Sequence, residues 1–196
     1  MSEREFDFAG LFAKGIPSPV TSVAVPQPKF NFILGHTSPD LIPVEQLIDS
    51  TARALRKDGP GLAINLYKGG PMGYLPLREL LVKRLALHRG LNITSDDLII
   101  TSGSQTAIVL INSAFLESGD TVVMENFSYI GMLGDQRARG INIVGVKMDD
   151  HGMQMDDLSS TLDDLHVRGV RPKYIYTIPT VHNPTGTIMP MERRLE

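Results

Sequence analysis

The most constraining feature of this sequence is an alternation of apolar segments with helix-like segments between residues 97 and 178. Strand-like apolar runs occur at residues 97–101, 121–125, 141–146 and 173–178. Segments with a helical pattern lie between them, at residues 105–116, 129–139 and 155–167. Near-continuous apolar strands separated by helices are typical of a parallel sheet covered on both faces. The sequence therefore predicts an α/β fold, with a predominantly parallel sheet sandwiched by helices.

The residues ahead of this region predict a different organisation. Residues 15–28 carry four prolines and little periodicity, which indicates an extended N-terminal arm. Apolar residues at helical spacing then predict a helix from Val44 to Leu55, and a second helix runs from Pro76 to Gly90. We expect residues 1–60 to form the arm and the first helix, as part of a small domain, and residues 61–196 to begin a large domain.

Composition excludes several classes of function. The net charge of −3 offers no broad positive field for nucleic acid or an anionic membrane. No apolar run approaches the roughly 18 residues that a membrane helix needs, and the acidic N-terminus lacks a signal core. The absence of cysteine suits a reducing compartment and removes thiolate chemistry, and the five histidines show no metal-ligand spacing. We expect a cytoplasmic protein that acts on small molecules, with no metal.

The segment Ser102-Gly103-Ser104-Gln105 lies directly between a predicted strand and a predicted helix. Unpaired backbone N–H groups and the positive end of the helix dipole meet at such a position and can bind an anion. Gly103 allows close approach of a ligand to the backbone, and Ser104 adds a hydroxyl donor. The alternative is a well-capped turn without a ligand.

Two further segments are expected at the same edge of the sheet, since the carboxyl ends of parallel strands meet there. Asn183-Pro184-Thr185-Gly186 follows the strand at residues 173–178, and a cis X-Pro bond could direct the Asn183 amide at a ligand. Tyr129 follows the strand at residues 121–125 and could stack on a flat heterocycle. The alternatives are an ordinary turn and a packing tyrosine.

Together these segments resemble a known family. Three segments, in family order, are similar to the first motifs of class I/II aminotransferases, which are pyridoxal-phosphate enzymes of fold type I: residues 101–107, 124–129 and 176–186. Residues 73–79 and 35–43 also resemble family segments. The resemblance covers most of the chain from about residue 30 onward. It implies an incomplete large domain of the fold type I transferases.

The resemblance also implies roles for individual residues. Gly103, Ser104 and Gln105 would hold the phosphate of pyridoxal 5'-phosphate through backbone and hydroxyl donors. Tyr129 would stack on the pyridine ring of the cofactor. Asn183 would form a hydrogen bond with the phenolic oxygen of that ring.

Two more residues receive roles from the same resemblance. Tyr67 would reach the cofactor phosphate of the neighbouring subunit, as expected in a family built as homodimers, and Gly35 would lie near the substrate carboxylate. The substrates implied are an amino acid and a 2-oxo acid, between which an amino group is transferred.

The family also uses a Schiff-base lysine, which no lysine of this chain matches in its sequence setting. Residues 190–196 begin a helix that stops after barely two turns, so we expect this chain to be an N-terminal fragment that is inactive alone. Two alternatives stay open. One is another enzyme of the same cofactor and fold, a lyase or a decarboxylase. The other is a non-catalytic protein, either the effector domain of a regulator or a truncated interaction partner.

Overall fold

The computed structural model describes residue 29, residues 37–64 and residues 68–196. The described chain divides into two compact units, one containing residues 102–196 and the other the described residues between 20 and 101. The predicted arm at residues 15–28, Gly35 and Tyr67 lie outside the described residues. The boundary predicted at residue 60 between a small and a large domain stays a prediction.

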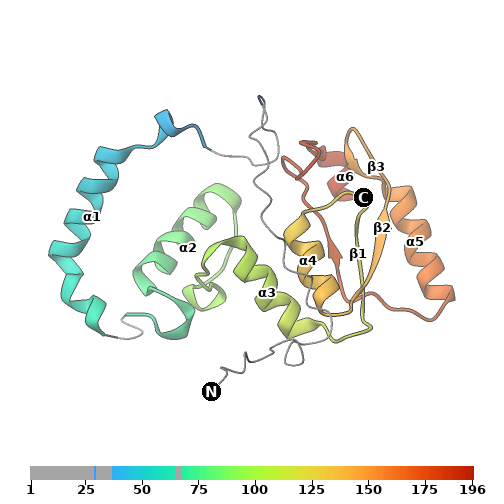
Figure 1. The fold of residues 1–196 in the computed structure, drawn as a ribbon, viewed down its shortest axis with the longest axis horizontal. Helices are drawn as coiled ribbons and strands as arrows, with labels where there is room; N and C mark the ends of the chain where they lie inside the picture. The colour runs from blue at the N-terminus through green and yellow to red at the C-terminus, as the bar shows by residue number, and fades with distance from the viewer. Residues whose placement is uncertain (1–28, 30–36, 65–67) are drawn as a thin grey trace, which may run out of the picture. The chain divides into compact units, whose positions relative to one another are not determined.

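The unit of residues 102–196 is built on a three-stranded parallel sheet (Figure 1). Its strands are β1 (Thr121–Glu125), β2 (Asn142–Val146) and β5 (Ile175–Tyr176), in the order β2-β1-β5. The central strand β1 pairs along its whole length with β2, from Thr121 opposite Asn142 to Glu125 opposite Val146. The parallel sheet predicted from the alternating pattern is therefore confirmed, with β1 at its centre.

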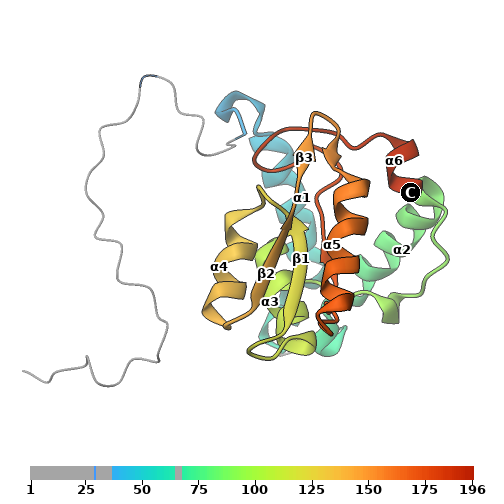
Figure 2. The same cartoon turned by 90° about the vertical axis from the view of Figure 1, so that its right-hand side faces the viewer.

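Helices cover both faces of this sheet, as Figures 1 and 2 show. The helices of this unit are α3 (Gly103–Phe115), α4 (Ile130–Ala138), α5 (Met155–Val167) and α6 (Met191–Leu195). Helices α3 and α4 lie on one face of the sheet, and α5 lies on the other. The predicted helical segments at residues 105–116, 129–139 and 155–167 all form helices, and the sandwiched α/β architecture is confirmed.

Strand β1 supplies the core of both layers, because alternate side chains of a strand point to opposite faces. Val122 and Met124 pack with the cluster under α3 and α4, whereas Val123 packs with the cluster under α5. All three side chains are fully buried. Complete burial of such a side chain contributes about 1.5–3 kcal/mol to stability. Thus β1 holds the unit together and fixes the position of its own carboxyl end.

A short hairpin follows β2. Strands β3 (Met148–Asp149) and β4 (Gly152–Met153) pair antiparallel, and Gly152 has a φ of 93° that favours glycine. Neither of these two short strands is among the strands predicted from the sequence.

The second unit contains two long helices, α1 (Val44–Asp58) and α2 (Leu75–Arg89). Gly90 ends α2 in the left-handed conformation, with a φ of 66°. Both predicted helices are confirmed. The short 3-10 helices of this unit are η2 (Pro39–Leu41), η3 (Gly59–Ala63), η4 (Gly70–Met72) and η5 (Ser95–Asp97).

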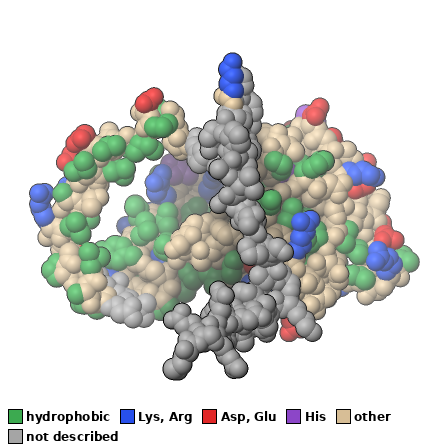
Figure 3. Space-filling model, in the orientation of Figure 1, with side chains coloured by type: hydrophobic (Ala, Val, Ile, Leu, Met, Phe, Trp, Pro, Cys, Tyr) green, Lys and Arg blue, Asp and Glu red, His purple; other side chains and the backbone are tan. Residues whose placement is uncertain are grey.

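The apolar face of α1 is exposed in the described structure. Hydrophobic side chains gather along this helix (Figure 3), and Val44, Leu47, Ile48 and Leu55 are each about half exposed, between 50% and 54%. No described helix is long and apolar enough to cross a membrane.

Two of the predicted strands differ in the structure. Residues 97–101 do not form a strand; Ser95–Asp97 is a 3-10 helix with a Thr94/Asp97 capping box, and irregular chain follows it. A strand requires a neighbouring strand for its ladder, whereas Ile100 N donates to the oxygen of Met72, in η4, at 2.9 Å. Strand β5 is shorter than the predicted residues 173–178, because only Ile175 and Tyr176 pair in register with β1.

Candidate functional site

The candidate site begins at the N-terminal turn of α3. Ser102 is the N-cap residue, and Gly103 starts the helix with a φ of 78°, in the left-handed region that favours glycine. The amides of Ser104 and Gln105 lie in the first turn, where N–H groups have no acceptor within the helix. Together with the positive end of the helix dipole, this turn can bind an anion such as a phosphate group.

Gln105 connects this turn to the start of α4. Its Nε2 donates to the oxygen of Gly131 at 3.2 Å. A Cβ added at Gly131 would lie 2.2 Å from Gln105 Oε1 and 2.6 Å from the ring atoms Cε1 and Cζ of Tyr129. These three residues are thus in close contact, and the glycine at position 131 makes that contact possible. The structure brings the predicted phosphate turn and Tyr129 together at the carboxyl end of β1.

Tyr129 is itself held in place by its backbone and its ring. It is the N-cap residue of α4, and its oxygen accepts the amides of Met132 and Leu133 at 3.0 and 3.2 Å. Its half-buried ring packs against the apolar cluster under α3 and α4. The partly exposed ring can therefore offer a flat surface to a ligand without a large loss of side-chain entropy.

The third predicted segment, residues 176–186, is bound to the carboxyl end of β1 by hydrogen bonds to Glu125. This buried residue, the last of β1, accepts hydrogen bonds at Oε1 from the hydroxyl of Thr177, at 2.5 Å, and from the amide of Ile178, at 3.0 Å. His182 Nε2 lies 4.0 Å from the same oxygen. Asn183 follows His182 directly and is exposed, so its amide is free of the protein core. Asn183 thus lies on a loop whose start is tied to the end of β1 by the hydrogen bonds of Glu125.

Backbone and arginine contacts close the loop that carries Asn183. Met189 N donates to Pro179 O at 2.9 Å, and Arg194 donates to the oxygens of both Pro179 and Met189, at 2.7 and 2.9 Å. The Asn183–Pro184 peptide bond is cis, which is one of the forms considered from the sequence, and Gly186 has a φ of 76°. The predicted turn is therefore a closed loop with Asn183 at its exposed part.

Buried polar atoms without hydrogen-bond partners are concentrated near the carboxyl end of β1. Among the described residues, five buried side-chain atoms have no hydrogen-bond partner, and four of them belong to residues at or next to the three segments: Gln105 Oε1, Glu125 Oε2, Ser128 Oγ and His182 Nε2. Buried polar atoms are paired in the great majority of folded proteins, since an unpaired one costs about 1–3 kcal/mol. Their concentration here fits a site that receives a polar ligand.

Tyr176 adds a neutral hydroxyl close to this edge. Burial of the side chain raises the pKa of Tyr176 above its usual value, and the nearby negative charge of Glu125 raises it further. The phenol therefore stays protonated at physiological pH.

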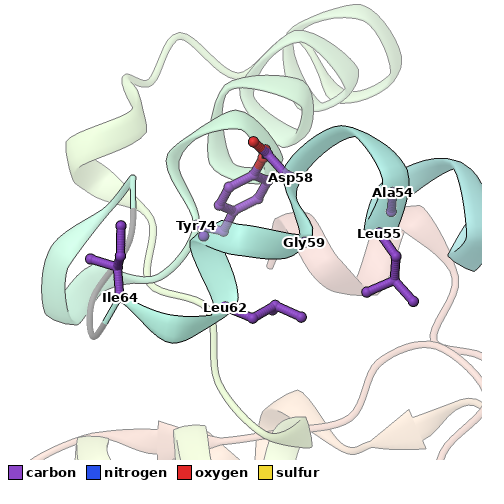
Figure 4. A pocket seen from close by; sticks show the side chains of 8 residues that line it. Ala54, Leu55, Asp58, Gly59, Leu62, Ile64 and Tyr74 are labelled. Carbon is purple, nitrogen blue, oxygen red and sulfur yellow. The ribbon is translucent and has the colours of Figure 1, made fainter.

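The second unit contains a separate hollow, shown in Figure 4, with a volume of about 410 Å³. It is lined mostly by apolar side chains, among them Leu55, Leu62 and Ile64. Its polar part is Asp58, which accepts hydrogen bonds from Tyr74 OH at 2.7 Å and from Lys68 Nζ at 3.1 Å. This hollow has none of the anion-binding features of the α3 turn.

Three residues of the site were not assigned a role from the sequence. Glu125 was visible only as the end of an apolar strand, although a carboxylate on a strand that is otherwise buried is itself a signal of a polar partner. His182 was considered only among the histidines without metal-ligand spacing, and the structure buries it to 2% exposure. No sequence pattern marks Gly131 as part of the site, since its role depends on the Tyr129 ring and on the side-chain amide of Gln105 from another helix.

Comparison with known proteins agrees with this geometry. The family model described as aminotransferase class I and II matches residues 43–194. Aromatic-amino-acid aminotransferase 1 of Thermococcus litoralis is 34% identical over 160 residues, which are 82% of this chain and 38% of that protein. An uncharacterised HTH-type transcriptional regulator of Bacillus subtilis, YisV, is 31% identical over 83% of this chain and 31% of its own length.

A solved structure shows the same likeness. Kynurenine aminotransferase of Pyrococcus horikoshii, solved in complex with PMP and with KYN as substrate, matches with a TM-score of 0.75 and 35% identity. The match covers 83% of this chain and 39% of that one. The chain thus spans less than two fifths of the length of these three relatives.

The parallel sheet, with the N-terminal turn of α3, the Tyr129 ring and the Asn183 loop near the carboxyl end of its central strand, has the α/β fold of the fold type I aminotransferases. The chain belongs to the class I and II aminotransferase family.

Proposed function

We propose that the protein to which this chain belongs is a pyridoxal-phosphate-dependent aminotransferase, which moves an amino group from an amino acid to a 2-oxo acid. The observation that supports this most strongly is the convergence of the α3 turn, Tyr129 and the Asn183 loop on the carboxyl end of β1. The relatives named aminotransferases supply the reaction class.

The residues present fit the cofactor on three grounds. The first turn of α3 supplies donors for a phosphate group, with the amides of Ser104 and Gln105 in the position that phosphates occupy at helix N-termini. Tyr129 presents a partly exposed ring that Gly131 leaves room for. The unpartnered buried atoms of Gln105 and Glu125 lie at the same edge. We assign the phosphate to Gly103, Ser104 and Gln105.

Within this proposal each residue has one task. Pyridoxal phosphate, when bound, supplies the electron sink that amino transfer requires. Tyr129 would stack on its ring and exclude water from one face, and Asn183 would donate a hydrogen bond to its phenolic oxygen and orient the ring. Gly35, near the substrate carboxylate, and Tyr67, at the phosphate of a partner subunit, lie outside the described residues and keep the roles that the sequence suggests.

The proposal includes a homodimer, since Tyr67 would serve the site of the neighbouring subunit. It also includes a complete protein longer than this chain, in which a lysine forms the Schiff base. A cytoplasmic location completes the proposal and is supported by the absence of cysteine.

The test is a transamination assay of the complete protein, loaded with pyridoxal phosphate and given an amino-acid donor with a broad panel of 2-oxo acids. We expect a new amino acid from at least one acceptor. A protein that binds the cofactor and yet transfers no amino group to any acceptor would contradict the aminotransferase assignment and favour the lyase or decarboxylase alternative.

A second candidate function is supported by the similarity to the regulator YisV, which covers 83% of this chain. In that case the domain would bind the cofactor as an effector and would not catalyse turnover. Cofactor binding without turnover, together with a DNA-binding domain in the complete protein, would favour this candidate.

A further inference from the structure

Two buried ionisable residues, Glu125 and His182, hold no part of the cofactor in the proposed function, although both lie next to the loop that carries Asn183. Glu125 and His182 are each 2% exposed. They come from opposite ends of the site in sequence, one from the end of β1 and the other from the loop after β5. Ionisable side chains are seldom buried without a partner, so their meeting here requires an explanation.

Only one of the two carboxylate oxygens of Glu125 forms hydrogen bonds. Its Oε1 accepts the hydroxyl of Thr177 and the amide of Ile178, the two residues that follow β5. Its Oε2 is buried and has no partner among the described residues. The carboxylate therefore ties the chain after β5 to the end of β1 and still keeps acceptor capacity toward the loop beyond it.

The hydrogen bonds of His182 define which ring nitrogen carries the proton. Nδ1 lies 3.4 Å from the amide nitrogen of Thr185 and 2.9 Å from its hydroxyl oxygen. A backbone N–H can only donate, so Nδ1 acts as the acceptor and the ring proton resides on Nε2. Nε2 is the atom that lies 4.0 Å from Glu125 Oε1. The N–H dipole of the imidazole thus faces the carboxylate.

The backbone of His182 closes the turn as well. Its amide donates to Thr187 O at 2.8 Å, and its oxygen accepts the amide of Gly186 at 2.6 Å. Asn183 therefore lies inside a short closed loop, with His182 at its base. A change in the position of the imidazole would move this base, and Asn183 with it.

We propose that Glu125 and His182 are positioning residues for Asn183. The imidazole, held by Thr185 on one side and facing the Glu125 carboxylate on the other, fixes the base of the loop to the end of β1. The Asn183 amide is thereby held in the position from which it would donate to the phenolic oxygen of the cofactor. This inference rests on the proposed function, because it concerns the aim of a cofactor-binding residue.

The experiment uses the complete protein loaded with pyridoxal phosphate and its visible absorption spectrum, which reports the state of the phenolic oxygen. Asn183→Ala provides the reference change in the spectrum. We expect His182→Ala and Glu125→Ala to change the spectrum in the same direction and to lower kcat about 10- to 100-fold, as small misplacements of catalytic geometry do. Affinity for the cofactor phosphate should change less than kcat, because the α3 turn is left intact.

Conservative variants separate positioning from stability. Glu125→Gln keeps an acceptor for Thr177 and Ile178, and His182→Gln keeps a donor near the position of Nε2, so both should bring the spectrum back toward that of the wild type. His166→Ala removes an exposed histidine of α5 and is the matched control. If His182→Ala does not fold, His182→Gln is compared with His182→Asn, whose side chain is too short to face Glu125. The positioning role then predicts a spectrum closer to the wild type in His182→Gln than in His182→Asn.

The outcomes distinguish the two proposals. A wild-type protein that takes up no pyridoxal phosphate would overturn the proposed function, and this inference with it. A spectrum that changes in Asn183→Ala and stays unchanged in folded His182→Ala and Glu125→Ala would overturn the positioning role alone. In the cofactor-free protein, ¹⁵N signals of the His182 ring should show the proton on Nε2; a proton on Nδ1 would overturn the arrangement independently of any cofactor.

Discussion

At the scale of single residues, the site depends on a contact that no single segment of the sequence contains. Gly131 sits between the amide of Gln105 and the ring of Tyr129, which come from different helices. The absence of a side chain at position 131 lets both approach the backbone of α4. One glycine thus determines how closely the first turn of α3 and the Tyr129 ring come together.

Gly131→Ala should therefore destabilise the protein and displace Tyr129 or Gln105. The new Cβ would lie 2.2–2.6 Å from those side chains, and overpacking of this kind costs about 1–3 kcal/mol. Gly134→Ala, also in α4, is the matched control, because nothing lies within 4 Å of its new Cβ. That change should be neutral or stabilise the helix by up to about 1 kcal/mol. Urea unfolding of both variants tests this; equal midpoints would contradict it.

At the scale of elements, several helix boundaries follow from local chemistry that the sequence displays. Gly90 ends α2 in the left-handed conformation, and Pro43 precedes the first residue of α1. Asp157, in the first turn of α5, connects that helix to the end of β2 by accepting both the amide and the Nζ of Lys147, each at 2.8 Å. These local contacts fix where each element begins or ends.

Gly90→Ala should lower the free energy of unfolding by about 1 kcal/mol, since only glycine adopts a φ of 66° without strain. Gly59→Ala is the control: Gly59 has a φ of −51°, in the right-handed helical region, and its new Cβ meets nothing within 4 Å. Thermal unfolding of the two variants should separate them. A loss of stability in Gly59→Ala as large as that in Gly90→Ala would contradict the conformational explanation.

The Asp157 contact predicts a dependence of stability on acid pH. The hydrogen bonds from the Lys147 ammonium and amide hold the pKa of Asp157 below its ordinary value of 3.8. A depressed folded-state pKa stabilises the protein fully above the unfolded value of about 3.9, and that contribution disappears as the pH falls through the folded pKa. Asp157→Asn should therefore be less stable than the wild type at pH 7. On acidification, its free energy of unfolding should fall by less than that of the wild type.

Asp156→Asn is the matched control for this change, because Asp156 is the exposed neighbour of Asp157 in the same helical turn and the substitution alters the net charge equally. Unfolding midpoints measured from neutral pH to about pH 3, below the unfolded carboxyl pKa, compare the two variants. The same acid response in both variants would show that net charge, and not the Lys147 contact, is responsible.

At the scale of the whole molecule, the described chain carries the groups that would hold a cofactor, and three of its described lysines form ion pairs on the surface. Lys68, Lys147 and Lys173 form ion pairs with aspartates, and their side chains are 45%, 70% and 46% exposed. We expect none of these three lysines, each held by an aspartate, to form the Schiff base.

The purified 196-residue chain should accordingly show no transaminase turnover in the assay that detects activity in the complete protein. The reason is chemical, because holding the cofactor without a lysine to form its Schiff base provides binding but no catalytic cycle. The complete protein, assayed at the same concentration, is the positive control. Detectable turnover by residues 1–196 alone would contradict this prediction.

Much of the fold could be read from the sequence, because periodicity and turn chemistry are local properties. The strand at residues 121–125 and the helix at residues 155–167 have the predicted bounds in the structure. The segment at residues 97–101 was predicted as a strand and is irregular chain. These residues are equally apolar as a strand or as irregular chain. Only the presence of a neighbouring strand to pair with would decide between the two conformations.

By itself, the sequence determined the α/β class, the order of the long helices and of the parallel strands β1, β2 and β5, and the three segments that approach the end of β1. Only the tertiary structure decided that Gly131 makes room for Tyr129 and Gln105, and that Glu125 and His182 are buried together beneath the Asn183 loop. The physical reason is distance along the chain. Local patterns dictate local conformation, whereas the meeting of residues more than about 20 positions apart depends on how a completed sheet packs its helices and loops.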